Sequence, residues 1–305
     1  MFRTNTFIRS AIRTVKPVST KPFLCKRLYA TIEPSGDSVA FIVAGPGYLD
    51  GSDIVETVSA SIHFGAKGYK VVYFTPDGNQ EETVNHSTKE TDVNEIRDYA
   101  VEATRVTRVA PLKLQNFRAE NYKALFIPGG AAVTKIFSNF DEKKSNFSVD
   151  TAVEKVIKDC HSSKKPILAV DNAGILLAKV LGTKSGGEGV RVTVGSLDKE
   201  TEELFQAVGA SHAVRDTTDV VVDEDNLVYT SPAFGGKSSA FNDVHAGIGK
   251  LVKEVLANTT AMGIKKEGGG KEKELSNEQR IENWKKRVRE NAEKAAEKER
   301  QKEKV

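Results

Sequence analysis

Short apolar runs alternate along the chain with longer segments in which apolar residues recur at helical spacing. A run without polar residues is typical of a strand that is buried on both faces of a parallel sheet. The spacing of Ile54, Val58 and Ile62 is typical of a helix with one apolar face, and Ser52 is placed to act as its N-cap. The alternation predicts βαβ units and an α/β fold with a mostly parallel sheet and helices on both faces.

The predicted elements follow one another closely through the body of the chain. Strands are expected at 39–44, 69–74, 124–127 and 166–170, a strand–helix pair at 190–208, and two strands around a turn at 219–229. Helices are expected after Ser52, at about 94–108, at 149–160 and at 244–257. Because ligands of parallel sheets bind at the carboxyl ends of the strands, the loops after Ala44, Ile127 and Val170 are the first candidates for a site.

The composition is that of an ordinary globular protein, with 29% charged and 39% hydrophobic residues. No apolar run approaches the roughly 20 residues that a transmembrane helix needs, so we expect none. The two cysteines, Cys25 and Cys160, exclude a disulfide framework and a CxxC metal or redox pair. The net charge of +3 comes from the two ends of the chain and by itself indicates no partner.

The first segment, residues 1–29, has the composition of a mitochondrial transit peptide. It is rich in Arg, Lys, Ser and Thr, and the first acidic residue of the chain is Glu33. The sequence Arg27-Leu28-Tyr29-Ala30 resembles a matrix-protease site with cleavage after Tyr29. We therefore expect a protein of the mitochondrial matrix. A basic arm that binds nucleic acid or lipid is the alternative interpretation.

The remaining chain divides into a body at 38–260, a flexible linker at 261–275 and a charged segment at 276–305. The linker contains a run of three glycines, and Ser276 with Gln279 forms a capping-box signature. The last segment carries a narrow apolar stripe, made of Ile281, Trp284, Val288, Ala292 and Ala295. It is predicted to be either a solvated single helix held by ion pairs or a docking helix or short coiled coil anchored by Trp284.

The loop after the first strand contains Gly45-Pro46-Gly47, which invites a dinucleotide-binding interpretation. The third glycine of that fingerprint is missing, because position 50 is Asp, and a lone GxG is a weak signal. We expect no cofactor.

A second turn is more informative. At Asp171 an apolar strand runs directly into a helix through one polar residue, which is the layout of a nucleophile elbow. In that geometry the backbone N–H of the next residue, Asn172, can bind an oxyanion. Gly129 and Gly130, at the end of a neighbouring strand, could supply the other donor, since glycine lets the backbone approach closely.

The order of segments from about residue 39 to residue 256 resembles the ElbB-type branch of the PfpI and class I glutamine-amidotransferase-like superfamily, including its mitochondrial members. The resemblance implies a flavodoxin-like sandwich, often dimeric, and its enzymatic members act through a cysteine on small reactive carbonyl compounds. The stretches that carry it are Gly45-Pro46-Gly47-Tyr48-Leu49-Asp50-Gly51-Ser52-Asp53, Phe74-Thr75-Pro76-Asp77, Val84-Asn85-His86, Phe126-Ile127-Pro128-Gly129-Gly130, Lys165-Pro166-Ile167-Leu168-Ala169-Val170, Tyr229-Thr230-Ser231-Pro232-Ala233-Phe234 and His245-Ala246-Gly247-Ile248-Gly249.

The chain departs from this family at the residues that carry its chemistry. The resemblance places the family's elbow cysteine at Asp171 and a second cysteine at Pro46. It places the acidic residue that supports the thiolate, a Glu in the family, at Asp53. Cys160 lies on a helix before the strand and is interpreted as structural. Thiolate chemistry is therefore not expected.

Asp171 has three interpretations. It could form an acid/base pair with Asp53, because two carboxylates in one pocket share a proton. It could cap the following helix, or it could hold a divalent metal with Asp53 and His86. Gly47 and His86 are expected at the rim of the pocket; no resident metal is expected.

These features favour a catalytically degenerate protein that binds a small metabolite, or a protein partner through its C-terminal helix. The alternative is an active glyoxalase-like, lyase or hydrolase enzyme that uses Asp171 as base or nucleophile. We expect neither a nucleic acid nor a membrane as partner, and the resemblance is compatible with a homodimer.

Overall fold

The computed structural model describes residues 37–261 apart from 81, 93 and 197. Its centre is a seven-stranded sheet in the order β12-β13-β9-β8-β1-β2-β7, in which β12 alone runs antiparallel to its neighbour. The predicted flavodoxin-like α/β fold is confirmed. The strands are β1 (Ser38–Ile42), β2 (Lys70–Thr75), β7 (Leu112–Lys113), β8 (Leu125–Ile127), β9 (Ile167–Val170), β12 (Val221–Asp223) and β13 (Val228–Ser231).

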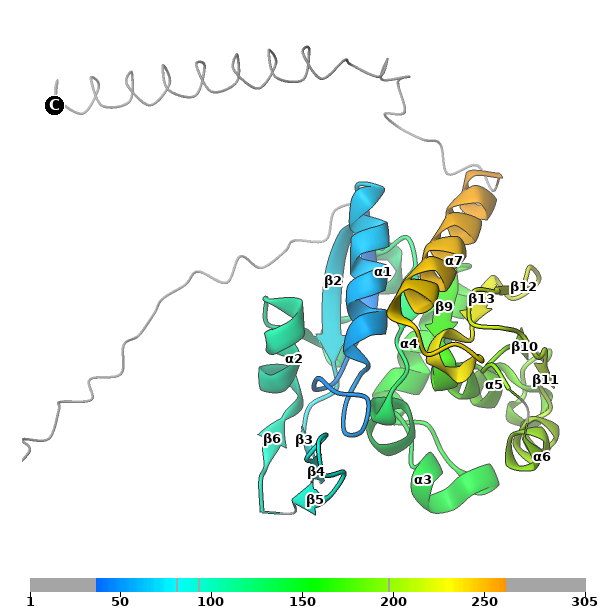
Figure 1. Cartoon of the computed structure of the whole chain (residues 1–305). Helices are drawn as coiled ribbons and strands as arrows, with labels where there is room; N and C mark the ends of the chain where they lie inside the picture. Colours follow the sequence, from blue (N-terminus) through cyan, green and yellow to red (C-terminus); the bar gives the residue numbers. More distant parts are fainter. Residues whose placement is uncertain (1–36, 81, 93, 197, 262–305) are drawn as a thin grey trace, which may run out of the picture.

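Helices cover both faces of the sheet (Figure 1). On one face, α1 (Ile54–Ala66) and α7 (Phe241–Ala261) lie side by side. On the other face lie α4 (Thr151–Ser162), α5 (Gly174–Leu181) and α6 (Lys199–Val208). Successive residues of a strand point to opposite faces, so β1 contributes Val39 and Phe41 to the first core and Ala40 and Ile42 to the second.

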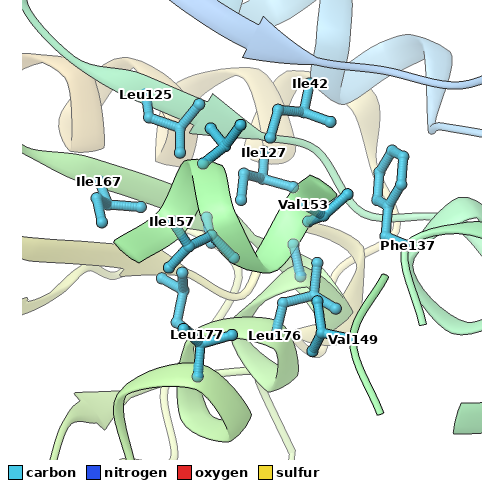
Figure 2. Packing of buried hydrophobic residues seen from close by; sticks show 14 of the residues in the cluster. Ile42, Leu125, Ile127, Phe137, Val149, Val153, Ile157, Ile167, Leu176 and Leu177 are labelled. Atoms are coloured by element: carbon cyan, nitrogen blue, oxygen red, sulfur yellow. The ribbon is translucent and has the colours of Figure 1, made fainter. Parts of the chain in front are cut away.

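Helix α4 packs its apolar stripe against the middle of the sheet. Val153, Val156, Ile157 and Cys160 recur at helical spacing and are all buried. Figure 2 shows Val153 and Ile157 beside the strand residues Ile127 and Ile167. Burying a residue of this size stabilises the fold by about 1.5–3 kcal/mol, so this contact fixes β8 and β9 firmly. Cys160 is 1% exposed, as expected for a residue of the core.

Two helix starts differ from the sequence prediction. The N-cap of α1 is Asp53, whose Oδ1 accepts from the amide of Glu56 at 3.0 Å. Ser52 instead accepts a hydrogen bond from the amide of Ala44 through Oγ. Helix α2 (Tyr99–Thr107) begins later than expected because its N-cap is Asp98, which accepts from the amide of Val101.

Beyond the carboxyl end of β2, short strands form a small extension that the sequence did not reveal (Figure 1). These strands are too short and too polar to leave a periodic pattern. Antiparallel pairs join β3 (Asn79–Gln80) to β6 (Arg97–Asp98) and β4 (Thr83–Val84) to β5 (Thr91–Asp92). Elsewhere β10 (Arg191–Val192) pairs with β11 (Ser211–His212), and a single π-helical turn, η3 (Ala132–Ile136), precedes α3 (Phe140–Lys143).

The predicted terminal segments fall almost entirely outside the described residues. These are the transit peptide at 1–29, the linker at 261–275 and the charged helix at 276–305. Helix α7 continues to Ala261, one residue past the predicted end of the body. Within residues 37–261 no helix is both long and apolar enough to cross a membrane.

Candidate functional site

The turn between β9 and α5 has the geometry of a nucleophile elbow. Strand β9 ends at Val170, and Asp171 follows in the left-handed region with φ of +52°. A short 3₁₀ turn, η5 (Asp171–Ala173), then leads into α5. A left-handed conformation is strained for a residue other than glycine and persists only when the surrounding structure fixes it. The elbow predicted at Asp171 is therefore present in the backbone.

Glycine backbones on two other loops pack closely around the Asp171 side chain. A Cβ atom added to Gly129 would lie 2.7 Å from both Cβ and Oδ2 of Asp171. A Cβ atom added to Gly235, in the 3₁₀ turn η7 (Ala233–Gly235), would lie 2.8 Å from Oδ1 of Asp171 and 2.3 Å from the carbonyl oxygen of Val194. The side chain thus occupies a slot that only glycine can line. Gly235 was not identified from the sequence.

Backbone amides converge on the Asp171 carboxyl group. The amides of Asn172, Gly130 and Gly235 lower its pKa, so they are near enough to favour its ionised form. The first two are the donors predicted for an oxyanion, and here they lie beside the protein's own carboxyl group. Asp171 is the first residue of η5, and its carboxyl group lies beside the Asn172 amide of that turn, so the capping interpretation stays a prediction. The Asn172 side chain donates through Nδ2 to the carbonyl oxygen of Gly130 at 3.1 Å, which ties the two loops together.

A second carboxyl group, that of Glu56 on α1, lies behind Gly129. Glu56 is fully buried, and its Oε2 accepts a hydrogen bond from the Gly129 amide at 2.7 Å. Burial raises the pKa of Glu56 well above its ordinary value, and the charges of Asp171 and Asp53 raise it further. Sequence analysis missed this residue. The available signal was its place four residues before Ala60, on the buried face of the helix.

Asp53 completes the group at the start of α1. Besides capping the helix, it donates its backbone amide to the carbonyl oxygen of Gly129 at 2.9 Å. Burial raises its pKa, although hydrogen bonds from the amides of Glu56 and Val55 oppose the change. Asp53 thus lies near Asp171, as the pairing hypothesis required, but its carboxylate also serves α1 as a cap.

The pKa of Asp171 rises to about 7, chiefly because of burial and also because of the charge of Asp53. The amides of Asn172, Gly130 and Gly235 act in the opposite direction, since they stabilise the ionised form. Like charges in one buried place disfavour full ionisation. The cluster of Asp53, Glu56 and Asp171 therefore retains a proton near neutral pH.

Sequence and structural comparisons place the chain among proteins with this fold. It is 32% identical over 258 residues to the human mitochondrial glutamine amidotransferase-like class 1 domain-containing protein 3, covering 82% of this chain and 94% of the relative. It is 34% identical over 229 residues to the mitochondrial ES1 protein homolog of Rattus norvegicus, covering 72% of this chain and 84% of the relative.

The chain belongs to this mitochondrial amidotransferase-like (ES1) family. Among solved structures, it resembles an isoprenoid biosynthesis protein with an amidotransferase-like domain from Ehrlichia chaffeensis. That match has a TM-score of 0.65 and 29% identity and covers 72% of this chain and 99% of the other. No family model matches the chain.

Membership of the amidotransferase-like family bears on the chemistry available at Asp171. The family's elbow is present, but the position at which the resemblance expects a cysteine holds a carboxyl group. Cys160 does not replace that thiol, because it lies on the buried face of α4 and burial raises its pKa to about 12. A thiol with so high a pKa is not ionised at neutral pH and is a poor nucleophile.

The predicted rim residues contact each other: Gly47 lies on the loop after β1, and His86 follows β4 (Thr83–Val84). The His86 ring packs edge-on against Tyr48 at 5.4 Å between centroids, and its Nε2 lies 3.8 Å from Oδ1 of Asp50. A Cβ atom added to Gly47 would lie 2.5 Å from the same Nε2. The described contacts of His86 are with this loop and with Val84, and none joins it to Asp171.

The metal interpretation required Asp53, Asp171 and His86 in one place. Across the described part of the chain, no three His, Cys, Asp or Glu side chains are arranged to hold a metal ion. His86 lies with Asp50 and not with the elbow. The structure therefore does not bring together the three ligands that the metal interpretation needs.

Proposed function

We propose that this chain is a catalytically degenerate member of the mitochondrial amidotransferase-like family, one that binds a small metabolite or a protein partner. The observation that carries the proposal is the position of the Asp171 carboxyl group, which packs closely against Gly129 and lies beside the Gly130 and Asn172 amides. These amides are the ones that would stabilise an oxyanion formed on a substrate. Because the Asp171 carboxyl group occupies the position beside these amides, they are not free to donate to a substrate oxygen.

The chemistry of the side chain supports the same proposal. A cysteine thiolate at the elbow could attack a carbonyl carbon, but a carboxylate is a weak nucleophile and cannot form a hemithioacetal. Burial also raises the pKa of the neighbouring Glu56 well above its ordinary value. The elbow therefore retains the shape of a family active site without its reactive group.

A second candidate function follows from the pKa of Asp171, which is about 7. A carboxyl group with that pKa is suited to general acid/base catalysis at physiological pH. In this alternative, Asp171 removes or returns a proton on a small carbonyl compound, and Glu56 holds a second proton beside it. Catalysis would require Asp171 to leave its amide partners.

Turnover of methylglyoxal by the purified full-length chain distinguishes the two candidates. We expect no rate above the protein-free background for the wild type or for Asp171→Asn. A wild-type rate that Asp171→Asn abolishes, with unfolding temperature retained, would overturn the degenerate assignment and support acid/base catalysis. Asp225→Asn, which changes an exposed carboxylate at the turn between β12 and β13, is the matched control.

The C-terminal segment 276–305 is proposed to bind a protein partner. Its sequence supports this, since Trp284 lies on a narrow apolar stripe between charged faces. The test is affinity capture from mitochondrial extract with the full chain, with a chain ending at Gly268, and with Trp284→Ala. Partners lost equally with both variants support the proposal, and an unchanged set overturns it.

Two further expectations belong to the same proposal. The relatives are named mitochondrial, and we propose the matrix as the compartment, with removal of residues 1–29. Amino-terminal sequencing of the mature protein tests the cleavage after Tyr29.

A homodimer is supported by Ile54, Val58 and Ile62, which form an exposed apolar stripe on α1. Sedimentation of the wild type and of Ile62→Glu tests it; a monomeric wild type would overturn it.

A further inference from the structure

His212, on β11, binds the backbone of residues 193–196, the segment that follows β10. Its Nε2 accepts a hydrogen bond from the amide of Val194 at 3.1 Å. Because a backbone N–H can only donate, Nε2 carries no proton, and the single proton of the neutral ring is on Nδ1. Nδ1 is buried and has no hydrogen-bond partner within the described residues. The geometry therefore determines both the charge and the tautomer of His212.

The same segment, residues 193–196, packs against the elbow. A Cβ atom added to Gly235 would lie 2.3 Å from the carbonyl oxygen of Val194 and 2.8 Å from Oδ1 of Asp171. The amide of Ser196 donates to the carbonyl oxygen of Gly235 at 3.1 Å. Gly235 thus lies between this segment and the Asp171 carboxyl group, and it contacts both.

The surroundings of His212 disfavour a positive charge on its ring. The ring packs against Phe205 of α6, with 5.0 Å between the ring centroids. The charged residues of the elements that pack against β11 are exposed; they are Arg191 on β10 and Lys199, Glu200, Glu202 and Glu203 on α6. Burial lowers the pKa of His212 from its ordinary value of 6.5. The ring is therefore neutral at pH 7 and gains its second proton only at a lower pH.

A second proton on His212 is incompatible with the bond to Val194. A doubly protonated imidazole donates from both nitrogens and accepts from neither. Its Nε2–H would face the Val194 N–H, and two donors at 3.1 Å do not form a hydrogen bond. Since the amide of Val194 loses its acceptor, the ring and the segment must move apart.

We propose that His212 is a pH-dependent switch of the elbow: its neutral ring holds residues 193–196 against Gly235, and protonation of the ring releases them. Release of the segment loosens Gly235 and, with it, the packing around the Asp171 carboxyl group. Imidazole is suited to this role because it changes charge between about pH 5 and pH 8. The proposal rests on the proposed function only in taking the elbow as the site that is regulated.

An NMR titration of the full-length chain from pH 8 to pH 5 tests the proposal through the backbone amides of Val194 and Gly235. We expect both amide signals to shift together with the His212 ring, with a midpoint below pH 6.5. Hydrogen exchange at the Val194 amide, corrected for its intrinsic rate, should become about tenfold faster as the bond is lost. Titration of Asp171 gives a separate step, because its pKa is about 7.

His212→Gln provides an amide oxygen that can accept from Val194 at every pH. In this variant the step below pH 6.5 should disappear from the Gly235 signal. His161→Gln is the matched control, because His161 lies on α4 and its Nε2 bonds to Oδ1 of Asn226 at 3.0 Å. The Gly235 step in the control should equal that of the wild type.

Two results would overturn the proposal. One is a Gly235 signal that does not respond while the His212 ring is protonated, and the other is a Gly235 step of equal size in His212→Gln and the wild type. If circular dichroism shows that His212→Gln is unfolded, the wild-type titration decides, since the Val194 and Gly235 amides must then shift with the ring. Methylglyoxal turnover does not enter these measurements, so a failure of the switch leaves the degenerate assignment standing, and the reverse also holds.

Discussion

The charge of Asp171, at the elbow after β9, raises the pKa of Glu56, which lies on α1 behind the Gly129 backbone. Removing the charge of Asp171 should therefore ease ionisation of Glu56. We expect Asp171→Asn to lower the apparent pKa of Glu56. Glu56 itself is unchanged in this variant and still accepts from the Gly129 amide, so the loop should be retained. A carbon-detected NMR titration of the Glu56 carboxyl group measures the change.

The control for this titration is Asp225→Asn. Asp225 is an exposed carboxylate at the turn between β12 and β13 and is not among the groups that shift the pKa of Glu56. The Glu56 titration should be the same in this variant as in the wild type. A Glu56 pKa that does not respond to Asp171→Asn would contradict the coupling.

The raised pKa of Asp171 should make the unfolding free energy depend on pH. Its folded-state pKa is about 7, above the ordinary value of 3.8, so the stability that it contributes is present below pH 4 and is lost as pH rises through 7. Asp171→Asn has no such loss. Between pH 5 and pH 8 the wild type should lose about 2 kcal/mol of unfolding free energy relative to Asp171→Asn, as urea denaturation would show. Glu56 acts in the same direction in both proteins.

Asp198→Asn is the control for this pH dependence. Asp198 caps α6, and its hydrogen bonds with Thr201 lower its pKa. It therefore stabilises the fold above its unfolded pKa, and the contribution is lost as pH falls. The difference between wild type and this variant should change only below pH 4. A difference between wild type and Asp171→Asn that stays constant from pH 5 to pH 8 would refute the raised pKa.

Asp53 should show two separable roles. Asp53→Ser keeps a capping oxygen but removes the charge, so we expect nearly unchanged stability and a lower Asp171 pKa. Asp53→Ala loses the cap as well and should cost about 1 kcal/mol of unfolding free energy. Asp98→Ala removes the equivalent cap of α2 and should show a loss of stability without any change at Asp171. If the pKa of Asp171 is the same in Asp53→Ser as in the wild type, the charge of Asp53 does not act on Asp171.

The sequence predicted those parts of the molecule that local patterns determine. The uninterrupted run in β1 and the periodic residues of α4 gave the sheet and its covering helices, and Asp171 was identified because strand and helix meet there. Glu56 was missed because its role depends on the amide of Gly129, 73 residues away. The capping oxygen of α1 was placed at Ser52 because Ser and Asp at neighbouring positions are equally good caps.

The close packing of Gly129 against Asp171 can be tested directly. Gly129→Ala would bring a methyl group to 2.7 Å from Cβ and Oδ2 of Asp171 and to 2.9 Å from Oδ1 of Asn172. We expect a loss of about 1–3 kcal/mol in unfolding free energy, since overpacking forces the loop to move. Adding Asp171→Gly, which removes the side chain and suits the positive φ, should recover part of this loss.

Gly65→Ala is the matched control for this substitution. Gly65 lies within α1, and a Cβ atom added there meets nothing within 4 Å. That variant should gain up to about 1 kcal/mol, because alanine has the higher helix propensity. Chemical denaturation of Gly129→Ala, Asp171→Gly and the double variant gives the coupling energy. Additive losses would mean that the two residues do not touch, and the slot described around Asp171 would then be wrong.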